Sequence, residues 1–396
     1  MSGGVDERPG LSDAAPARRL RIAILNRGFF SRAGGAERYS ISLAEMLAAR
    51  HEVHVFAQHL DHDYPGITYH RVPQCVRRPS WINLFCYNFR TWRATRRGFD
   101  IVHSHENTWH GDIQTVHVRP VKVGLLVGRI GWRRWQRYLQ IATSPRLWMY
   151  LLIERARFAP RPGKRVIATS EPLRAELENA YPGLRGRTEV LPPGVHAVQT
   201  SDAAERTRLR QSLQLMDDAF VLLFVGNDYG KKGLGPTLEA LAAAPPEVAL
   251  VVVGNPAHIP EYRARAESLG VAGRVRFVGG AVDVAPYYRL ADALVHPTTE
   301  DTFAMVVLEA LAHGLPVVVS GPVWCGIAAS LTDGENALIL FDPRAVEEIV
   351  AAIARLQCDA LLRQKLASGG RRFTDGYIWE ELARRQEAIY FSTMAE

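Results

Sequence analysis

The stretch at residues 296–316 places a polar loop between a buried strand and the start of a helix. It reads H-P-T-T-E-D-T-F-A-M-V-V-L-E-A-L-A-H-G-L-P and follows a short apolar run at residues 293–295. Apolar residues recur at helical spacing over residues 303–313, and Gly314 and Pro316 end the helix. Free N–H groups at such a helix start can hold a phosphate. The stretch therefore predicts a phosphate-binding junction in an α/β protein.

Two acidic residues flank this junction. Asp301 lies on the loop and Glu309 lies inside the helix, with seven residues between them. The helical neighbours of Glu309 are apolar or small, so its carboxylate needs hydrogen-bond donors, which the hydroxyls of a ribose would supply. Asp301 could accept hydrogen bonds from a sugar, or it could cap the helix together with Thr302. We interpret the stretch as the donor end of a sugar-transfer site.

The pattern of apolar run, polar loop and helix repeats in both halves of the chain. Because 396 residues are too many for one core, two domains are expected. The sequence predicts an α/β protein of two Rossmann-like, doubly wound domains that face each other across a cleft. The expected strands are residues 20–25, 52–57, 67–72, 100–104, 111–117, 165–170 and 188–191, then 220–225, 249–253, 275–277, 293–295 and 317–320.

Composition indicates the domain limits. Residues 1–19 are rich in Gly, Ala, Pro, Arg and Asp and are expected to form a disordered tail. Residues 20–194 are expected to form the N-terminal domain, which ends at a Pro-Pro-Gly turn. Residues 195–373 would form the C-terminal domain, and residues 374–396 a helix that packs back toward the N-terminal domain.

Two further loops lie where strands meet helices. Gly34 and Gly35 precede the first helix, and they either form a flexible turn or let the backbone approach a ligand. The loop at residues 226–233 reads G-N-D-Y-G-K-K-G and contains Lys231 and Lys232. Two ammonium groups at a helix start can neutralise a diphosphate leaving group without a metal ion. Solvated surface lysines are the alternative, which the nearby acids make the weaker one.

Histidines gather near the ends of strands in the first half. His117 ends the strand at residues 111–117, and open α/β sheets bind ligands at the carboxyl ends of their strands. His103 and His105 share one face of the preceding strand and could form a metal pair. Since no third ligand is evident, hydrogen-bonded structural histidines are expected instead. The D-x-D triplet at residues 61–63 is interpreted as a solvated loop, so no metal site is expected.

The four cysteines are far apart in the sequence. Cys75, Cys86, Cys325 and Cys358 form no C-x-x-C pair and have no histidines at zinc-ligand spacing. The sequence therefore predicts neither a disulfide framework nor a zinc site, and a reducing cytoplasm is the default.

The positive charge is concentrated in one segment. The formal net charge is +7, and residues 119–165 carry twelve Lys or Arg against one acid, which leaves −4 for the rest of the chain. In this segment arginines alternate with Trp and Tyr, as in helices that lie at a membrane interface, and residues 71–99 repeat the composition. Nucleic-acid binding is the competing interpretation. Because no nucleic-acid motif is present, an anionic membrane surface is favoured as partner, and no apolar run is long enough to span a bilayer.

Taken together, these motifs resemble the family-four retaining glycosyltransferases, which have the two-domain GT-B fold. Residues 301–309 resemble the family's two acids separated by seven residues. The chain is most similar to the lipopolysaccharide-core glucosyltransferase group, because of T-V-H-V-R-P at residues 115–120, the basic aromatic segment after it and W-C-G-I-A-A at residues 324–329. Further motifs in matching order are Gly34-Gly35, Lys232-Gly233, V-R-F-V-G-G at residues 275–280 and H-G-L-P-V-V-V-S at residues 313–320.

The resemblance implies a role for each matching residue. Glu309 would bind the ribose of the donor, whereas the catalytic contacts would come from Asp301 on the transferred sugar, Lys232 on the diphosphate and His117 near the reacting carbon and the acceptor hydroxyl. The N-terminal domain would bind the acceptor and the C-terminal domain the nucleotide sugar. The other donor-binding residues would be Gly34, Gly35, Asn227, Lys231, Val278, Gly279, Phe303, Ala304 and Met305.

Three positions depart from the family pattern. The first acid is Asp301, or the adjacent Glu300 if eight residues separate the pair; Asp301 keeps the helix in register. Asn227 stands where the family often has an arginine, for which Lys231 could compensate. Ala329 stands where many members have a glutamate, which leaves the donor sugar open.

The sequence therefore predicts a retaining, metal-independent hexosyltransferase. It would use a nucleotide diphosphate sugar as co-substrate and no cofactor, with UDP-glucose ahead of GDP-mannose. The acceptor would be a membrane-anchored glycolipid such as a lipopolysaccharide core, and residues 119–165 would hold the enzyme at the inner face of the cytoplasmic membrane. No nucleic-acid partner is expected. The alternatives are a transferase with a soluble acceptor and a non-catalytic basic protein with the GT-B fold.

Overall fold

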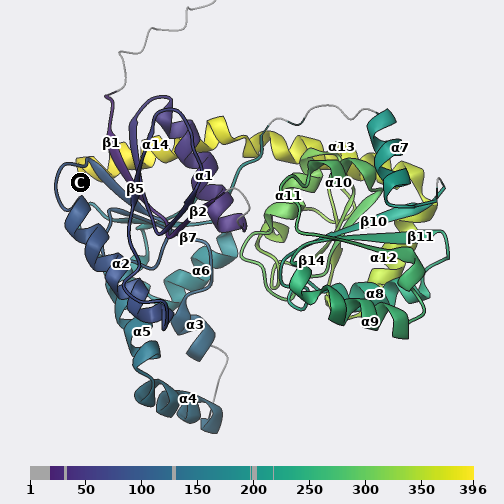
Figure 1. Cartoon of the computed structure of the whole chain (residues 1–396), viewed down its shortest axis with the longest axis horizontal. Helices are drawn as coiled ribbons and strands as arrows, with labels where there is room; N and C mark the ends of the chain where they lie inside the picture. The colour runs from purple at the N-terminus through teal and green to yellow at the C-terminus, as the bar shows by residue number, and fades with distance from the viewer. Residues whose placement is uncertain (1–17, 31–33, 127–130, 197, 199–202, 217) are drawn as a thin grey trace, which may run out of the picture.

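The computed structural model describes residues 18–30, 34–126, 131–196, 198, 203–216 and 218–396. A large parallel sheet occupies each half of the chain, and the two α/β units lie side by side (Figure 1). The predicted doubly wound α/β fold is thereby confirmed. The expected tail lies outside the described residues up to residue 17, and Arg18 pairs with Asp100 at 2.7 Å.

Both sheets have the strand order of a doubly wound fold. The order reverses between β1 and β6 in the first sheet and between β10 and β13 in the second, and ligands bind beyond the carboxyl ends of strands at such points. In sheet order the N-terminal strands are β5 (Ile67–Arg71), β3 (Glu52–Ala57), β1 (Arg21–Leu25), β6 (Ile101–Ser104), β7 (Ile113–Val116), β8 (Arg165–Ala168) and β9 (Thr188–Val190). The C-terminal strands are β12 (Val275–Gly279), β11 (Val248–Val253), β10 (Phe220–Val225), β13 (Ala293–His296), β14 (Val317–Ser320) and β15 (Leu338–Leu340).

Helices cover both faces of the C-terminal sheet. Every residue of β11 and all but the first of β10 are buried, as expected for parallel strands between two helical layers. One face carries α8 (Leu234–Ala243), α9 (Ile259–Ser268) and α12 (Val346–Cys358), and the other carries α10 (Ala285–Leu290) and α11 (Met305–Ala312). α11 is also in contact with α13 (Ala360–Thr374).

The C-terminal helix lies on the N-terminal unit. α14 (Trp379–Ala395) packs against α1 (Gly35–Ala48), and the ring of Trp379 meets that of Tyr39 edge-on at 5.3 Å. Val195 forms an isolated parallel bridge with Ile378, where the chain passes between the two units. The last helices therefore run along both units, as the yellow end of the chain in Figure 1 shows. Among the described helices, none is long and apolar enough to cross a bilayer.

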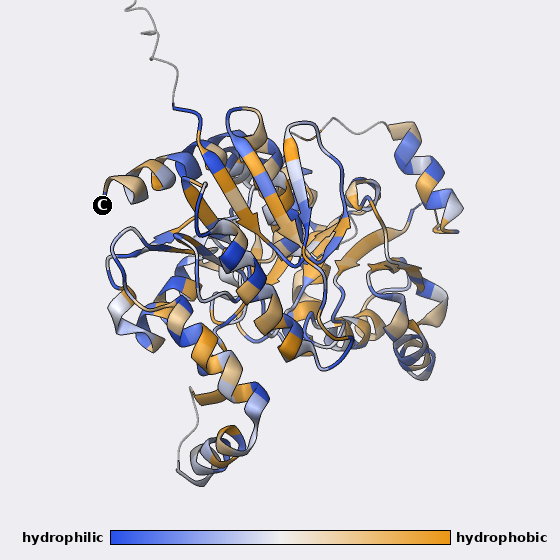
Figure 2. Ribbon diagram, turned by 60° about the vertical axis from the view of Figure 1, so that its left-hand side comes forward, coloured by the Kyte–Doolittle hydropathy of each residue, from blue (hydrophilic) through white to orange (hydrophobic). Residues whose placement is uncertain are grey.

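Between β7 and β8 the chain forms three helices, which we call the arm. They are α3 (Val121–Leu126), α4 (Gly131–Thr143) and α5 (Pro145–Arg157). The arm projects from the N-terminal unit, and hydrophobic and hydrophilic residues alternate along it (Figures 1 and 2). Its large exposed apolar side chains are Trp132, Trp135, Tyr138, Leu139, Trp148 and Leu152. Helix α2 (Ser80–Thr95) presents three more, Phe85, Phe89 and Trp92.

The segment between β1 and α1 contains a short strand. β2 (Gly28–Phe30) pairs in parallel with β4 (His59–Asp61), outside the main sheet. The fully buried ring of Phe29 drives this pairing, since it packs edge-on against His62 at 5.2 Å. His62 is in turn bound by Glu45 and Tyr69, at 3.0 and 2.7 Å. The histidine of the D-x-D triplet is therefore largely buried, whereas Asp61 and Asp63 are exposed, as expected for the two acids.

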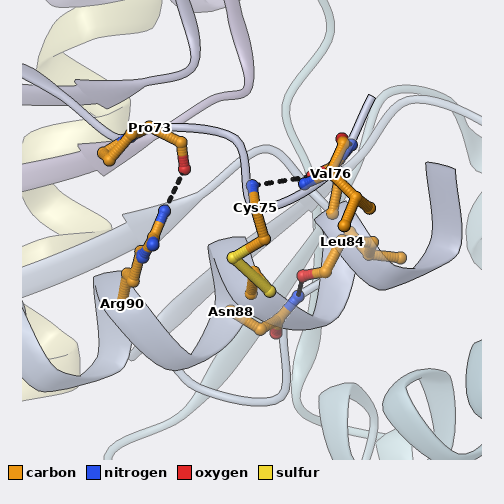
Figure 3. Close-up of a disulfide and its surroundings, with 8 residues drawn as sticks. Pro73, Cys75, Val76, Leu84, Asn88 and Arg90 are labelled. Atoms are coloured by element: carbon orange, nitrogen blue, oxygen red, sulfur yellow. Dashed lines mark hydrogen bonds between the residues drawn. A yellow bond between two sulfur atoms is a disulfide. The ribbon is translucent and has the colours of Figure 1, made fainter. Parts of the chain in front are cut away.

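The expectation that no disulfide forms was wrong. Cys75 and Cys86 are joined, with their Cα atoms 6.4 Å apart (Figure 3). The loop after β5 folds back onto α2, where the amide oxygen of Asn83 accepts the backbone N–H groups of Cys75 and Val76, both at 3.0 Å. This contact brings Cys75 beside the next turn of the helix, which carries Cys86. Cysteine usage therefore gives no support for a reducing compartment.

Candidate active site

Groups from both units meet at the carboxyl ends of the central strands. The hydroxyl of Thr302, in the loop between β13 and α11, donates to the carbonyl oxygen of His117 at 2.6 Å. The hydroxyl of Ser170, which precedes helix α6 (Glu171–Ala180), donates to the carbonyl oxygen of Thr302 at 2.7 Å. A cavity of about 40 Å³ opens here between the units. It is lined by Arg119, Ser170, Pro172, Leu173, Glu176, Thr299, Glu300, Asp301, Thr302, Pro322, Val323, Trp324 and Gly326.

Asp301 and Lys232 form an ion pair at the inner end of this cleft. Nζ of Lys232 lies 2.6 Å from Oδ2 of Asp301, and Nε2 of His296 lies 3.3 Å from the same oxygen. Burial by itself would raise the pKa of Asp301, but the hydrogen bond from His296 and the charge of Lys232 outweigh it and hold the pKa below its ordinary value. Oδ1 accepts the backbone N–H of Phe303 at 3.2 Å, so Asp301 also shapes the start of α11.

The adjacent residues Lys231 and Glu300 form a second ion pair, at the rim of the cleft. Nζ of Lys231 lies 3.1 Å from Oε2 of Glu300, and these side chains are 55% and 41% exposed, against 22% and 15% for Lys232 and Asp301. The structure thus places Asp301 inside the cleft and Glu300 at its edge. Of the two candidates for the first acid, Asp301 has the enclosed position that contact with a sugar requires.

Both carboxylate oxygens of Glu309 have partners. Oε1 lies 2.8 Å from Nη1 of Arg38 on α1, and Oε2 accepts the hydroxyl of Tyr288 at 2.7 Å. Burial, followed by the charge of Glu309, raises the pKa of Tyr288 well above its ordinary value, so this tyrosine stays a hydrogen-bond donor. Sequence reasoning missed both partners. Arg38 follows Gly35 by three residues, so its place in the first turn of the helix could have indicated it. No sequence pattern pointed to Tyr288.

Two helices, one from each unit, begin beside each other. The residue before α11 is Ala304, which has φ of 76°, and the residue before α1 is Gly34; neither helix has a side-chain cap. A Cβ added to Gly35 would lie 3.3 Å from Sδ of Met305, so the glycine lets the two helix starts approach. The predicted residues Gly34, Gly35, Phe303, Ala304 and Met305 are thus together, where the positive ends of two helix dipoles favour an anion.

The remaining predicted donor-binding residues follow other strands of the same sheet edge. Asn227 is exposed in the loop after β10, whereas Val278 and Gly279 end β12. Gly226 packs against the stem of Lys232, because an added Cβ would lie 2.8 Å from Cγ of that lysine. Within the described part of the chain, no hydrogen bond or ion pair joins Asn227 or Val278 to Lys232. These residues have in common only that they lie at the carboxyl ends of strands in the same sheet.

His117 belongs to a histidine cluster at the ends of β6 and β7. Its Nε2 lies 3.0 Å from Nδ1 of His105, and Tyr39 packs edge-on against its ring at 4.9 Å. The neighbouring His103 has partners on both nitrogens, Tyr390 and Thr115, each at 2.7 Å. Among the residues that the structure describes, no group of three or more His, Cys, Asp or Glu is placed to hold a metal ion.

This cluster makes the stability of the fold depend on pH. Burial lowers the pKa of His103 from 6.5 to about 3, so the folded state resists a proton that the unfolded chain accepts. The stabilisation is complete above pH 6.5 and is lost as the pH falls toward 3. For such a histidine the loss is about 2 kcal/mol at pH 5. Urea unfolding at pH 7.5 and pH 5.0 should show a smaller loss for His103→Gln than for the wild type; equal losses would contradict the assignment.

Comparisons with known proteins agree with this geometry. Residues 33–199 match the model for Glycosyltransferase Family 4, and residues 219–359 match that for Glycosyl transferases group 1. Lipopolysaccharide glucosyltransferase WaaG of Escherichia coli strain K12 is 29% identical over 233 residues, which are 57% of this chain and 62% of that enzyme. A D-inositol 3-phosphate glycosyltransferase of Jonesia denitrificans is 26% identical over 411 residues, covering 91% of this chain and 92% of that enzyme.

Two solved structures have the same fold over almost the whole chain. The crystal structure of WaaG superposes with a TM-score of 0.79 at 24% identity, over 93% of this chain and 99% of that one. Anabaena HepE in complex with UDP-glucose gives a TM-score of 0.74 at 18% identity, over 94% and 100% of the two chains. The two matching family models and the shared fold lead to one conclusion: the chain belongs to the family-four glycosyltransferases and has their GT-B fold.

Proposed function

We propose that the enzyme transfers a hexose, with retention of configuration, from a nucleotide diphosphate sugar to a membrane-anchored glycolipid. One observation carries the proposal: Lys232 pairs with Asp301 just before α11, Glu309 of α11 pairs with Arg38 of α1, and the uncapped starts of these two helices approach each other. Ammonium and backbone N–H groups suit a diphosphate, and carboxylates suit the hydroxyls of a ribose and a hexose. UDP-glucose is the donor we propose, with GDP-mannose as the second choice. The similarity to WaaG, a glucosyltransferase, supports this order.

In the proposed reaction the chain supplies positive charge where negative charge develops. Lys232 would turn from Asp301 to the diphosphate, and the N–H groups around Phe303 to Met305 would help it to stabilise the leaving group without a metal ion. Asp301 would then accept a hydroxyl of the sugar, and Glu309 would exchange Arg38 for the ribose. The acceptor hydroxyl would attack from the face that the phosphate leaves, and a departing phosphate oxygen would take its proton.

His117 would serve this reaction as a neutral residue. Burial, with the charge of Arg157 as a smaller cause, lowers the pKa of His117 from 6.5 to about 3. The imidazole would therefore not exchange protons with the acceptor near neutral pH, and its role would be to hold a substrate hydroxyl by hydrogen bonding. This fits a mechanism in which the phosphate is the base.

The proposal is tested by supplying UDP-glucose and a glycolipid acceptor in vesicles, with EDTA present. We expect UDP release that requires the acceptor and an α-linked product by NMR, since the donor is α-linked. A β-linked product would contradict retention, and activity only after addition of a divalent cation would contradict the metal-independent mechanism.

A soluble acceptor is the second candidate. It is favoured by the similarity to the D-inositol 3-phosphate glycosyltransferase of Jonesia denitrificans, which extends over 91% of this chain. Transfer to D-inositol 3-phosphate in the absence of vesicles would support this candidate, whereas transfer only to glycolipid would support the first.

We propose that the arm holds the enzyme on anionic membranes. Trp132 and Trp135 of α4 are 66% and 54% exposed, with stacked rings 5.0 Å apart. Aromatic side chains beside arginines suit the headgroup region of a bilayer. Replacing both tryptophans with serine should weaken binding to anionic vesicles about tenfold or more in a sedimentation assay, because each ring loses its apolar contact with lipid.

A matched control is available on the other unit. Phe341 is 89% exposed and lies outside the arm, so Phe341→Ser should bind vesicles like the wild type. Deletion of residues 125–158 should have a larger effect than the double substitution. Unchanged binding after the deletion would show that the arm is not the membrane contact.

A further inference from the structure

We propose that His105 is a positioning residue that fixes which nitrogen of His117 faces the substrate. The proposal rests on the function proposed above, in which His117 contacts the sugar or the acceptor. His105 follows β6 and His117 follows β7, and these neighbouring strands pair in parallel. The two imidazoles are nearly parallel, with an angle of 14° between the rings and 3.0 Å between Nδ1 of His105 and Nε2 of His117.

This hydrogen bond leaves one nitrogen of His117 for a ligand. Nε2 of His117 is occupied by His105, and Nδ1 has no hydrogen-bond partner among the described residues. His117 is half-buried at the carboxyl end of its strand, and its carbonyl oxygen accepts the hydroxyl of Thr302 next to Asp301. Nδ1 is therefore the atom that is left to bind a substrate hydroxyl.

The surroundings of His105 indicate where its proton lies. Its Nε2 is buried and has no partner among the described residues. A buried N–H without a partner costs more than a bare acceptor without one, so we assign the proton to Nδ1, which donates to His117. His117 then carries its own proton on Nδ1. The consequence is that His117 presents a hydrogen-bond donor to the oxygen of a substrate hydroxyl.

Neighbouring groups keep this arrangement neutral. His103 lies 4.2 Å from His105 between ring centroids, and the buried guanidinium of Arg157 donates to Gln114 and to the carbonyl oxygen of Thr115, at 3.0 and 2.7 Å. Burial, followed by the charges of His103, His117 and Arg157, lowers the pKa of His105 well below its ordinary value. A second proton on the pair is thus opposed from several sides, so both imidazoles stay neutral.

A set of substitutions separates positioning from packing. Asparagine places an N–H close to the position of Nδ1, whereas glutamine places one close to Nε2, and alanine offers neither. We expect His105→Ala and His105→Gln to lower kcat by about 10- to 100-fold, as other side chains that orient a functional imidazole do. His105→Asn should stay within about threefold of the wild type. All three should bind free UDP like the wild type, because UDP lacks the transferred hexose that His117 would contact.

A second measurement does not depend on turnover. Nitrogen-15 NMR of labelled histidine should show His117 protonated on Nδ1 in the wild type and in His105→Asn, and shifted toward the Nε2–H form in His105→Ala. The same tautomer in all variants, or equal activity of Asn and Gln variants, would overturn the positioning role. If the wild type transfers no sugar with any donor, the proposed function fails, and the tautomer result still decides whether His105 orients His117.

Discussion

Replacing Lys232 with methionine should lower the rate of hexosyl transfer by about 1000-fold, the loss typical of removing one group that stabilises developing charge. The side chain of Lys232 is 22% exposed, and its ammonium lies 2.6 Å from Asp301, at the place where we expect the diphosphate to leave. Methionine keeps the apolar stem that packs against Gly226, so the change removes the charge and little else. The measurement is the rate of UDP release from UDP-glucose in the presence of acceptor.

Lys231 is the matched control for this substitution. It is the adjacent lysine and has its own acidic partner, Glu300, but the pair is exposed at the rim. An exposed pair contributes about 1 kcal/mol or less, so Lys231→Met should reduce the rate by about fivefold at most. Equal losses of rate in Lys232→Met and Lys231→Met would show that the more buried position of Lys232 gives it no special role. Thermal unfolding of both variants checks that the fold is retained.

The second large effect is expected for Glu309. Glu309→Leu should weaken the binding of UDP by about 100-fold, because two charge-assisted hydrogen bonds to the ribose are lost. Arg38→Met should have the opposite effect and strengthen binding by about fivefold, since ribose hydroxyls would no longer compete with the guanidinium that lies 2.8 Å from Oε1. Isothermal titration calorimetry measures both.

These two variants test different parts of the account. Weaker UDP binding by Arg38→Met would mean that Arg38 itself contacts the nucleotide. Unchanged UDP binding by Glu309→Leu would show that Glu309 does not bind the ribose. Tyr288→Phe serves as an intermediate case, because it deletes only the hydroxyl that donates to Oε2 of Glu309 at 2.7 Å.

Sequence patterns predicted best those strands that are buried along their whole length. The strand at residues 220–225 matches β10, because a parallel strand covered on both faces is a continuous apolar run. The helix expected over residues 303–313 begins at Met305, since Ala304 takes a left-handed conformation that no periodicity reveals. The short pair of β2 and β4 was missed because three residues are too few to show an alternating pattern.

The contacts that complete the site could not be predicted, because they join residues far apart in the sequence. Local spacing identified Asp301 and Glu309, but it contains no information on their partners. Lys232 reaches Asp301 across 69 positions, and Arg38 reaches Glu309 from the other unit. The disulfide was missed for a related reason, since only the fold of the loop after β5 shows that Cys75 lies beside α2.

The most direct test of the central claim is a calorimetric titration of UDP into the protein in EDTA. We expect one site per chain, tighter binding of UDP than of GDP, ADP or dTDP, and loss of that site in Glu309→Leu. Binding of none of the four nucleotides, or UDP binding that Glu309→Leu leaves unchanged, would contradict the assignment of this cleft as the nucleotide-sugar site.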